Sequence, residues 1–118
     1  MDKERLIRAG IDYEDGVHRF AGRPEVYEKY LMKFFDQNEM PALRQALEQG
    51  DYDAAFRAAH NMKSNAGSLS LTAFYRAVCK LVDALRAGVR GESLLELFGQ
   101  AQTLYDAVRL TVKEDAHG

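Results

Sequence analysis

The stretch DYDAAFRAAHNMKSNAGSL, residues 51–69, decides the fold class, because its apolar residues recur every three or four positions, as on one face of a helix. Asp51 is a residue type that caps helix N-termini. At about 100° per residue, six apolar side chains fall in one arc, roughly 160° to 260° from His60. These are Ala55, Ala58, Ala59, Met62, Ala66 and Leu69. The stretch is therefore predicted to be a helix that buries its alanine-rich side and turns His60 to solvent.

Upstream of this stretch, apolar and aromatic residues at helical spacing predict a helix from Pro24 to about Met40. Its aromatic row is expected to lie in the core rather than to hold a cofactor. The row consists of Tyr27, Tyr30, Phe34 and Phe35. Pro41 is then expected to bend or break the chain, and a short helix follows that ends at Gly50.

Downstream, the spacing predicts helices over 72–87 and 93–113, and two short helices over 2–9 and 12–20 open the chain. No stretch alternates in the way that indicates a strand. Four long helices with short connections favour antiparallel packing. The expected fold class is all-α: an antiparallel four-helix bundle with short additional N-terminal helices.

The composition narrows the function classes. One domain over 1–118, with a core over about 10–112, is expected, because 118 residues can bury a core without a metal or a disulfide. There is no run of about 18 apolar residues. The charged start MDKERLIRAG indicates no secretory signal, so a cytoplasmic protein is expected. The net charge is −2 and the basic residues form no stripe, which argues against nucleic acid and membranes as partners. A monomer that binds another protein is expected.

The helix side that carries His60 is mixed and accessible. Seven residues project within about 60° of His60. They are Asp53, Phe56, Arg57, Lys63, Ser64, Gly67 and Leu71. An imidazole is a good phosphoryl carrier, because its neutral ring nitrogen is nucleophilic at physiological pH and the product can pass the group on. The ammonium of Lys63, one turn on, is placed to offset phosphoryl charge, and Arg57 is a second candidate for that role.

Small and apolar residues on the same side suit docking by another protein. Ser64 and Gly67 leave room for a partner's active site to approach the imidazole. Gly67 lies away from the core arc, which favours approach rather than packing as its role. Phe56 and Leu71 are expected to be exposed and to supply apolar docking contacts.

The stretch AAHNMKSNAGSLSL, residues 58–71, resembles the signature of the histidine-containing phosphotransfer (HPt) family, in which Lys follows the His at the third position and small residues share its face. The residues of this stretch to which the resemblance applies are His60, Lys63, Ala66 and Leu69. GIDYEDGVHRF and PEVYEKYLMKFF resemble the family's N-terminal helices, so the resemblance covers roughly residues 10–110. The family commonly has Gly directly after the Lys and again further along, where this chain has Ser64 and Ser70.

This resemblance implies a phosphoryl carrier of a two-component phosphorelay, in which His60 shuttles the group between receiver-domain aspartates. The chain contains no ATP-binding motif, so a carrier without its own kinase activity is expected. The implied partners are response-regulator receiver domains and a sensor histidine kinase. No cofactor or metal of its own is expected, and Mg²⁺ would come from the receiver.

Two other functions are compatible with the sequence. One is a phosphotransfer-inactive adaptor that keeps the bundle and docks a receiver or kinase without using His60. The other is an unrelated bundle that binds a metal, ligand or helix, although the paired Glu-x-x-His pattern of such metal sites is missing. His18 and His117 carry no matching signature and are expected to be solvent-exposed bystanders.

Overall fold

The structure is a computed structural model that describes the backbone of residues 1–117 and the side chains of residues 1–114. The described residues form seven helices and no strand, which confirms the all-α prediction. The helices are α1 (Lys3–Arg8), α2 (Tyr13–Arg19), α3 (Pro24–Gln37), α4 (Met40–Gln49), α5 (Tyr52–Ser68), α6 (Thr72–Arg86) and α7 (Glu92–His117). None of these helices combines the length and apolar character of a transmembrane span.

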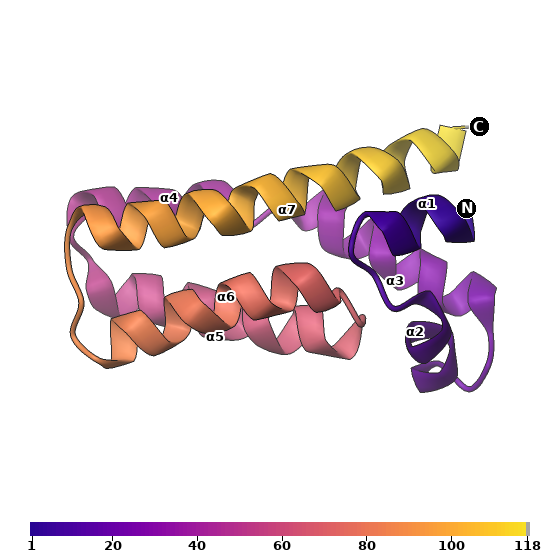
Figure 1. The fold of residues 1–118 in the computed structure, drawn as a ribbon, viewed down its shortest axis with the longest axis horizontal. Coiled ribbons are helices and arrows are strands. Elements are labelled where there is room, and N and C mark those ends of the chain that lie inside the picture. The colour runs from indigo at the N-terminus through magenta and orange to yellow at the C-terminus, as the bar shows by residue number, and fades with distance from the viewer. Residues whose placement is uncertain (118) are drawn as a thin grey trace.

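Helices α4, α5, α6 and α7 form an antiparallel four-helix bundle, as the fold class predicted, but its fourth member is the short α4 and not the long helix predicted from Pro24. Each packs against the next along the chain, and α4 closes the ring by packing against α7 (Figure 1). The other three helices gather at one end of the bundle. There α1 and α3 contact the C-terminal half of α7, and α2 lies against α3. The N-terminal segment therefore packs beside the end of the bundle where α5 turns into α6.

The break between α3 and α4 lies at Asn38. The helix was expected to reach about residue 40, but α3 ends at Gln37 because Asn38 takes a left-handed conformation with φ of 39°. Pro41 falls in the first turn of α4, where its missing N–H leaves no helical hydrogen bond unmade. The chain therefore breaks before Pro41. At the other end, Gly50 terminates α4 as predicted, with φ of 72°.

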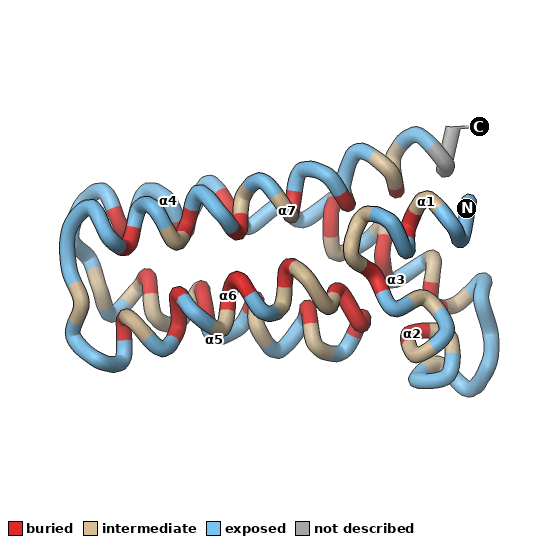
Figure 2. Tube along the Cα trace, viewed as in Figure 1, coloured by how far each residue is buried: buried red, intermediate tan, exposed pale blue. Residues whose placement is uncertain are grey.

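The core contains the alanine-rich side of α5 (Figure 2). Ala55, Ala59, Met62 and Ala66 are at most 1% exposed, whereas Ala58 lies at the edge of the buried arc. Small side chains on this face let α4 and α6 approach closely, and the larger side chains of α6 and α7 fill the interior. The predicted burial of α5 is thus confirmed.

The aromatic row of α3 is only partly in the core. Tyr27 and Phe35 are buried and Phe34 is half-buried, but Tyr30 is 43% exposed. The ring of Tyr30 stacks on that of Phe20, with centroids 5.3 Å apart. The prediction of a core position for Tyr30 is therefore wrong, because the segment that follows α2 covers one face of its ring and nothing in the bundle encloses it.

Candidate functional site

His60 lies at the middle of α5 and is exposed, as the helical projection predicted. Its ring packs beside the half-buried ring of Phe56, one turn earlier, with centroids 5.9 Å apart and planes tilted by 31°. Ser64, one turn later, donates a hydrogen bond from Oγ to the His60 carbonyl oxygen at 3.2 Å. The hydroxyl of Ser64 is therefore directed at the helix backbone. Among the described residues, no side chain hydrogen-bonds the imidazole nitrogens.

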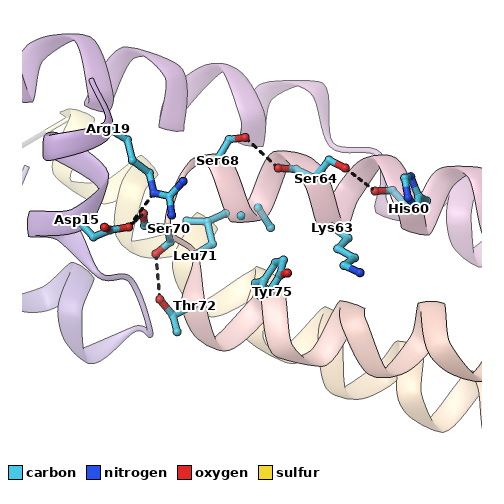
Figure 3. A pocket seen from close by; sticks show the side chains of 12 residues that line it. Asp15, Arg19, His60, Lys63, Ser64, Ser68, Ser70, Leu71, Thr72 and Tyr75 are labelled. Carbon is cyan, nitrogen blue, oxygen red and sulfur yellow. Dashed lines mark hydrogen bonds and ion pairs between the residues drawn. The ribbon is translucent and has the colours of Figure 1, made fainter. Parts of the chain in front are cut away.

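Two clefts meet at His60. The larger has a volume of about 500 Å³ and runs along α5 past Lys63 and Gly67 to Asp15 and Arg19 of α2 (Figure 3). The smaller, about 250 Å³, lies between α5 and the C-terminal end of α6. Its lining residues are Phe56, Arg57, His60, Asn61 and Arg86. A partner can therefore approach the imidazole from either side of α5.

Three cationic side chains border these clefts without a carboxylate partner among the described residues: Lys63, Arg57 and Arg86. The guanidinium of Arg86 lies over the Phe56 ring, 5.5 Å from its centroid, in a cation–π contact. This contact holds a positive charge next to the ring that flanks His60. Sequence reasoning missed Arg86, because only the antiparallel pairing of α5 and α6 brings the last turn of α6 to Phe56.

Ser64 and Gly67 both border the larger cleft, but only Gly67 also packs against another helix. Ser64 is exposed and small, and it borders the larger cleft as expected. Gly67 also borders this cleft, but a Cβ there would lie 3.3 Å from Cε2 of Tyr75 on α6. Gly67 thus admits the Tyr75 ring against α5. The expectation that Gly67 serves approach rather than packing is incomplete, because the position does both.

Leu71 does not belong to the exposed face. It was projected beside His60 on a continuous helix, but α5 ends at Ser68 and Ser70 takes a left-handed conformation with φ of 57°. The helical projection fails beyond that point. Leu71 begins α6 as its N-cap residue and is fully buried. The prediction that Leu71 is an exposed docking contact is therefore wrong.

Ser70 connects the turn between α5 and α6 to the N-terminal segment. Its buried Oγ donates a 2.6 Å hydrogen bond to Oδ2 of Asp15, which also accepts one from Arg19 Nε at 2.8 Å. These two bonds, that from Ser70 first, lower the pKa of Asp15. The backbone N–H of Asp12 donates to the Ser70 carbonyl at 2.9 Å, and the Tyr27 hydroxyl donates to that of Leu69 at 2.6 Å. The turn is therefore tied to both α2 and α3.

Asp53 and His18 line neither of the two clefts at His60. Asp53 is exposed on the first turn of α5, and His18 is exposed on α2. The side chain of His117 lies outside the described residues. Among the side chains that the structure describes, no group of three or more His, Cys, Asp or Glu residues is arranged to hold a metal ion.

The chain is similar to a known protein family. A family model described as Hpt domain matches residues 31–111, which is more than half of the chain. The matched segment includes all of α4, α5 and α6, and with them His60, Lys63 and Arg86, whereas α1 and α2 precede it. No curated protein and no solved structure matches the chain.

Proposed function

The chain belongs to the Hpt domain family, and we propose from this that His60 accepts a phosphoryl group from the aspartyl phosphate of one receiver domain and passes it to another. Hpt domains are phosphocarriers of two-component phosphorelays rather than enzymes with an ATP site of their own. The observation that carries the proposal is the exposed imidazole of His60 at the meeting point of two clefts, within the matched segment.

The proposed step is a direct transfer between side chains. Nε2 of the neutral imidazole attacks the phosphorus of the aspartyl phosphate, the bond from phosphorus to the aspartate oxygen breaks, and the carboxylate leaves. The imidazolium formed on His60 returns to neutrality by releasing its Nδ1 proton to water. Transfer to the next receiver reverses these bond changes. An exposed imidazole suits both directions of transfer, because the return step retraces the approach of the first receiver at the same ring nitrogen.

The cations around His60 support the same step. The phosphoryl group carries its negative charge through the transfer, and positive side chains held near it stabilise that charge most where the docked partner excludes water. Lys63 is the first candidate because it lies one turn from His60 on the same face. Arg86, held over Phe56, is the second, and Arg57, which lines the same smaller cleft, is the third.

In this proposal, the docked receiver domain brings its aspartate to His60 and supplies the metal ion for the transfer. The half-exposed Phe56 ring, the small Ser64 and the cleft beside Gly67 form a surface on which a receiver domain places its aspartate over His60. The receiver contributes Mg²⁺ and the acidic pocket that holds it. The partners of the relay are receiver domains and a sensor histidine kinase.

The proposal is tested by incubating the protein with a panel of receiver domains carrying labelled aspartyl phosphate. We expect label to move to the chain in an acid-labile, alkali-stable form, as phosphohistidine does. His60→Gln should abolish labelling, and His18→Gln, which changes another exposed histidine, should leave it intact. An adaptor that uses the bundle only for docking would bind receivers without becoming labelled. That result, or label persisting in His60→Gln, would overturn the proposal.

A further inference from the structure

The geometry points to a residue that selects the partner: we infer that Arg19 on α2 binds an acidic side chain of the docked receiver and thereby discriminates among receivers that transfer to His60. This inference rests on the proposed function, because it concerns the receiver that docks at the same site. Arg19 precedes the segment that the family model matches. The family match therefore assigns no role to Arg19, and its role is inferred from its contacts in the structure.

Arg19 and His60 border the same cleft at opposite ends. The cleft runs along α5 between them, with Lys63 and Tyr75 along its side (Figure 3). Ser68, at the α2 end of α5, lies eight positions after His60, which corresponds to about 12 Å of helix. A typical protein interface covers about 800 Å² on each partner, a patch roughly 30 Å across. A receiver docked over His60 therefore extends as far as Arg19.

The guanidinium of Arg19 keeps most of its donors for a partner. Its Nε donates to Asp15, and its two terminal nitrogens have no partner among the described residues. Those nitrogens form a planar group that suits a carboxylate. The two positive charges of Lys63 and Arg19 exceed the single negative charge of Asp15. The cleft is therefore locally positive, although the chain has a net charge of −2. An acidic side chain is the complementary occupant. A receiver without one would leave buried donors unpaired, which penalises its docking.

Asp15 and Ser70 position this guanidinium. Asp15 accepts hydrogen bonds from both Arg19 and the buried Ser70 hydroxyl, and the backbone of Asp12 is bonded to the same turn. Arg19 is therefore fixed relative to the C-terminal end of the helix that carries His60. This arrangement also gives Ser70 a role, because a glycine there would provide the left-handed turn without the hydroxyl that orients Asp15.

The test is the kinetics of transfer from a panel of phosphorylated receiver domains to wild-type chain, Arg19→Ala and Arg19→Glu. For the receivers that transfer best, we expect Arg19→Ala to raise KM about tenfold and to leave kcat unchanged. A tenfold rise corresponds to a loss of about 1.4 kcal/mol of binding free energy. Arg19→Glu should raise KM further and change the ranking of receivers. The matched control is Arg23→Ala, which removes an exposed arginine that pairs with Glu25 outside the cleft, and it should behave as wild type.

A small-molecule donor separates docking from chemistry. Phosphoramidate should phosphorylate His60 equally in the wild type and Arg19→Ala, because it needs no docking surface. If receivers label the wild type normally and KM is unchanged in Arg19→Ala, the inference about Arg19 is wrong while the proposed function stands. If no receiver labels the wild type, the proposed function fails and the inference fails with it.

The positioning role of Asp15 is tested by a double-mutant cycle. Asp15→Ala should raise KM without changing kcat, and the Asp15→Ala/Arg19→Ala double variant should show no larger KM than Arg19→Ala alone, because Asp15 acts through Arg19. Additive effects would mean that Asp15 acts independently, and they would overturn its assignment as the positioning residue. Circular dichroism on each variant checks that the helices are retained.

Discussion

Ser70 shows how the role of one residue depends on partners far away in the sequence. The sequence alone marks it as a serine where the HPt family commonly has glycine. In the structure it takes φ of 57°, a conformation that costs a non-glycine residue about 1 kcal/mol. The hydrogen bond from Oγ to Asp15, 55 positions away along the chain, offsets this cost. Sequence reasoning identified the residue but had no signal for its partner, because nothing in the spacing relates Asp15 to Ser70.

Substitutions at Ser70 are expected to separate strain from hydrogen bonding. Ser70→Ala keeps the strain and loses the hydrogen bond to the Asp15 carboxylate, so it should lower the free energy of unfolding. Ser70→Gly loses the same bond but adopts the turn without strain, so its loss should be about 1 kcal/mol smaller. Urea unfolding of both variants measures the difference. Equal stability, or a less stable glycine variant, would contradict the role given to the left-handed turn.

Arg86 is the cation that only the folded chain reveals. Replacing it with alanine removes a positive charge from beside Phe56 and His60, so we expect transfer from a receiver to slow about tenfold with the fold intact. This is less than the roughly 10²–10³-fold lost with a donor that contacts the reacting group directly. Lys63→Ala should slow transfer in the same direction. Arg76→Ala is the matched control, because Arg76 is an exposed arginine on the same helix that borders a different cleft. Single-turnover rates as fast as wild type would remove the tested cation from the mechanism.

At the scale of elements, the periodic spacing predicted the helices well, and most errors lie where the chain leaves a helix. The burial of Ala55, Ala59 and Ala66 follows from spacing alone, since a straight helix fixes which side each residue faces. The end of α3 at Asn38 and the burial of Leu71 do not. Both follow from a left-handed residue that redirects the chain, and neither Asn38 nor Ser70 is a glycine that would have marked the turn.

The pairing of α5 with α6 gives Gly67 a testable energetic role. Alanine at this position gains about 1 kcal/mol of helix propensity, but its Cβ would press against the half-buried Tyr75 ring at 3.3 Å. The ring borders the open cleft and can shift by a few tenths of an ångström. We therefore expect Gly67→Ala to raise the free energy of unfolding by about 0.5 kcal/mol, measured by urea unfolding. A destabilised variant would show instead that Tyr75 cannot move.

At the scale of the whole molecule, the N-terminal helices complete the surface around the bundle. α2 contributes Asp15 and Arg19 to the cleft that reaches His60, and α1 packs on α7. The sequence predicted these short helices but not their position, which depends on contacts such as that between Gly16 and Tyr27. The cleft is therefore formed jointly by the N-terminal segment and the bundle.

Gly16 tests this coupling, because a Cβ there would lie 2.3 Å from Cζ of the buried Tyr27 ring. Gly16→Ala should push α2 away from α3 and destabilise the chain by about 1–3 kcal/mol. It should also raise KM for receivers while labelling by phosphoramidate stays normal, because His60 lies on α5. Gly99→Ala, where a Cβ meets open space, is the control. Wild-type stability and KM in Gly16→Ala would contradict the coupling.

The central claim is that His60 is a two-way carrier, and onward transfer tests it most directly. The chain is first phosphorylated and purified, and a second, unphosphorylated receiver domain is then added with Mg²⁺. Phosphorus NMR should show the phosphohistidine signal disappear as an aspartyl phosphate forms on the receiver, in stoichiometric amount, and His60→Gln should give neither signal. A phosphohistidine that forms but never transfers to any receiver, or phosphate that appears on a residue other than His60, would contradict the claim.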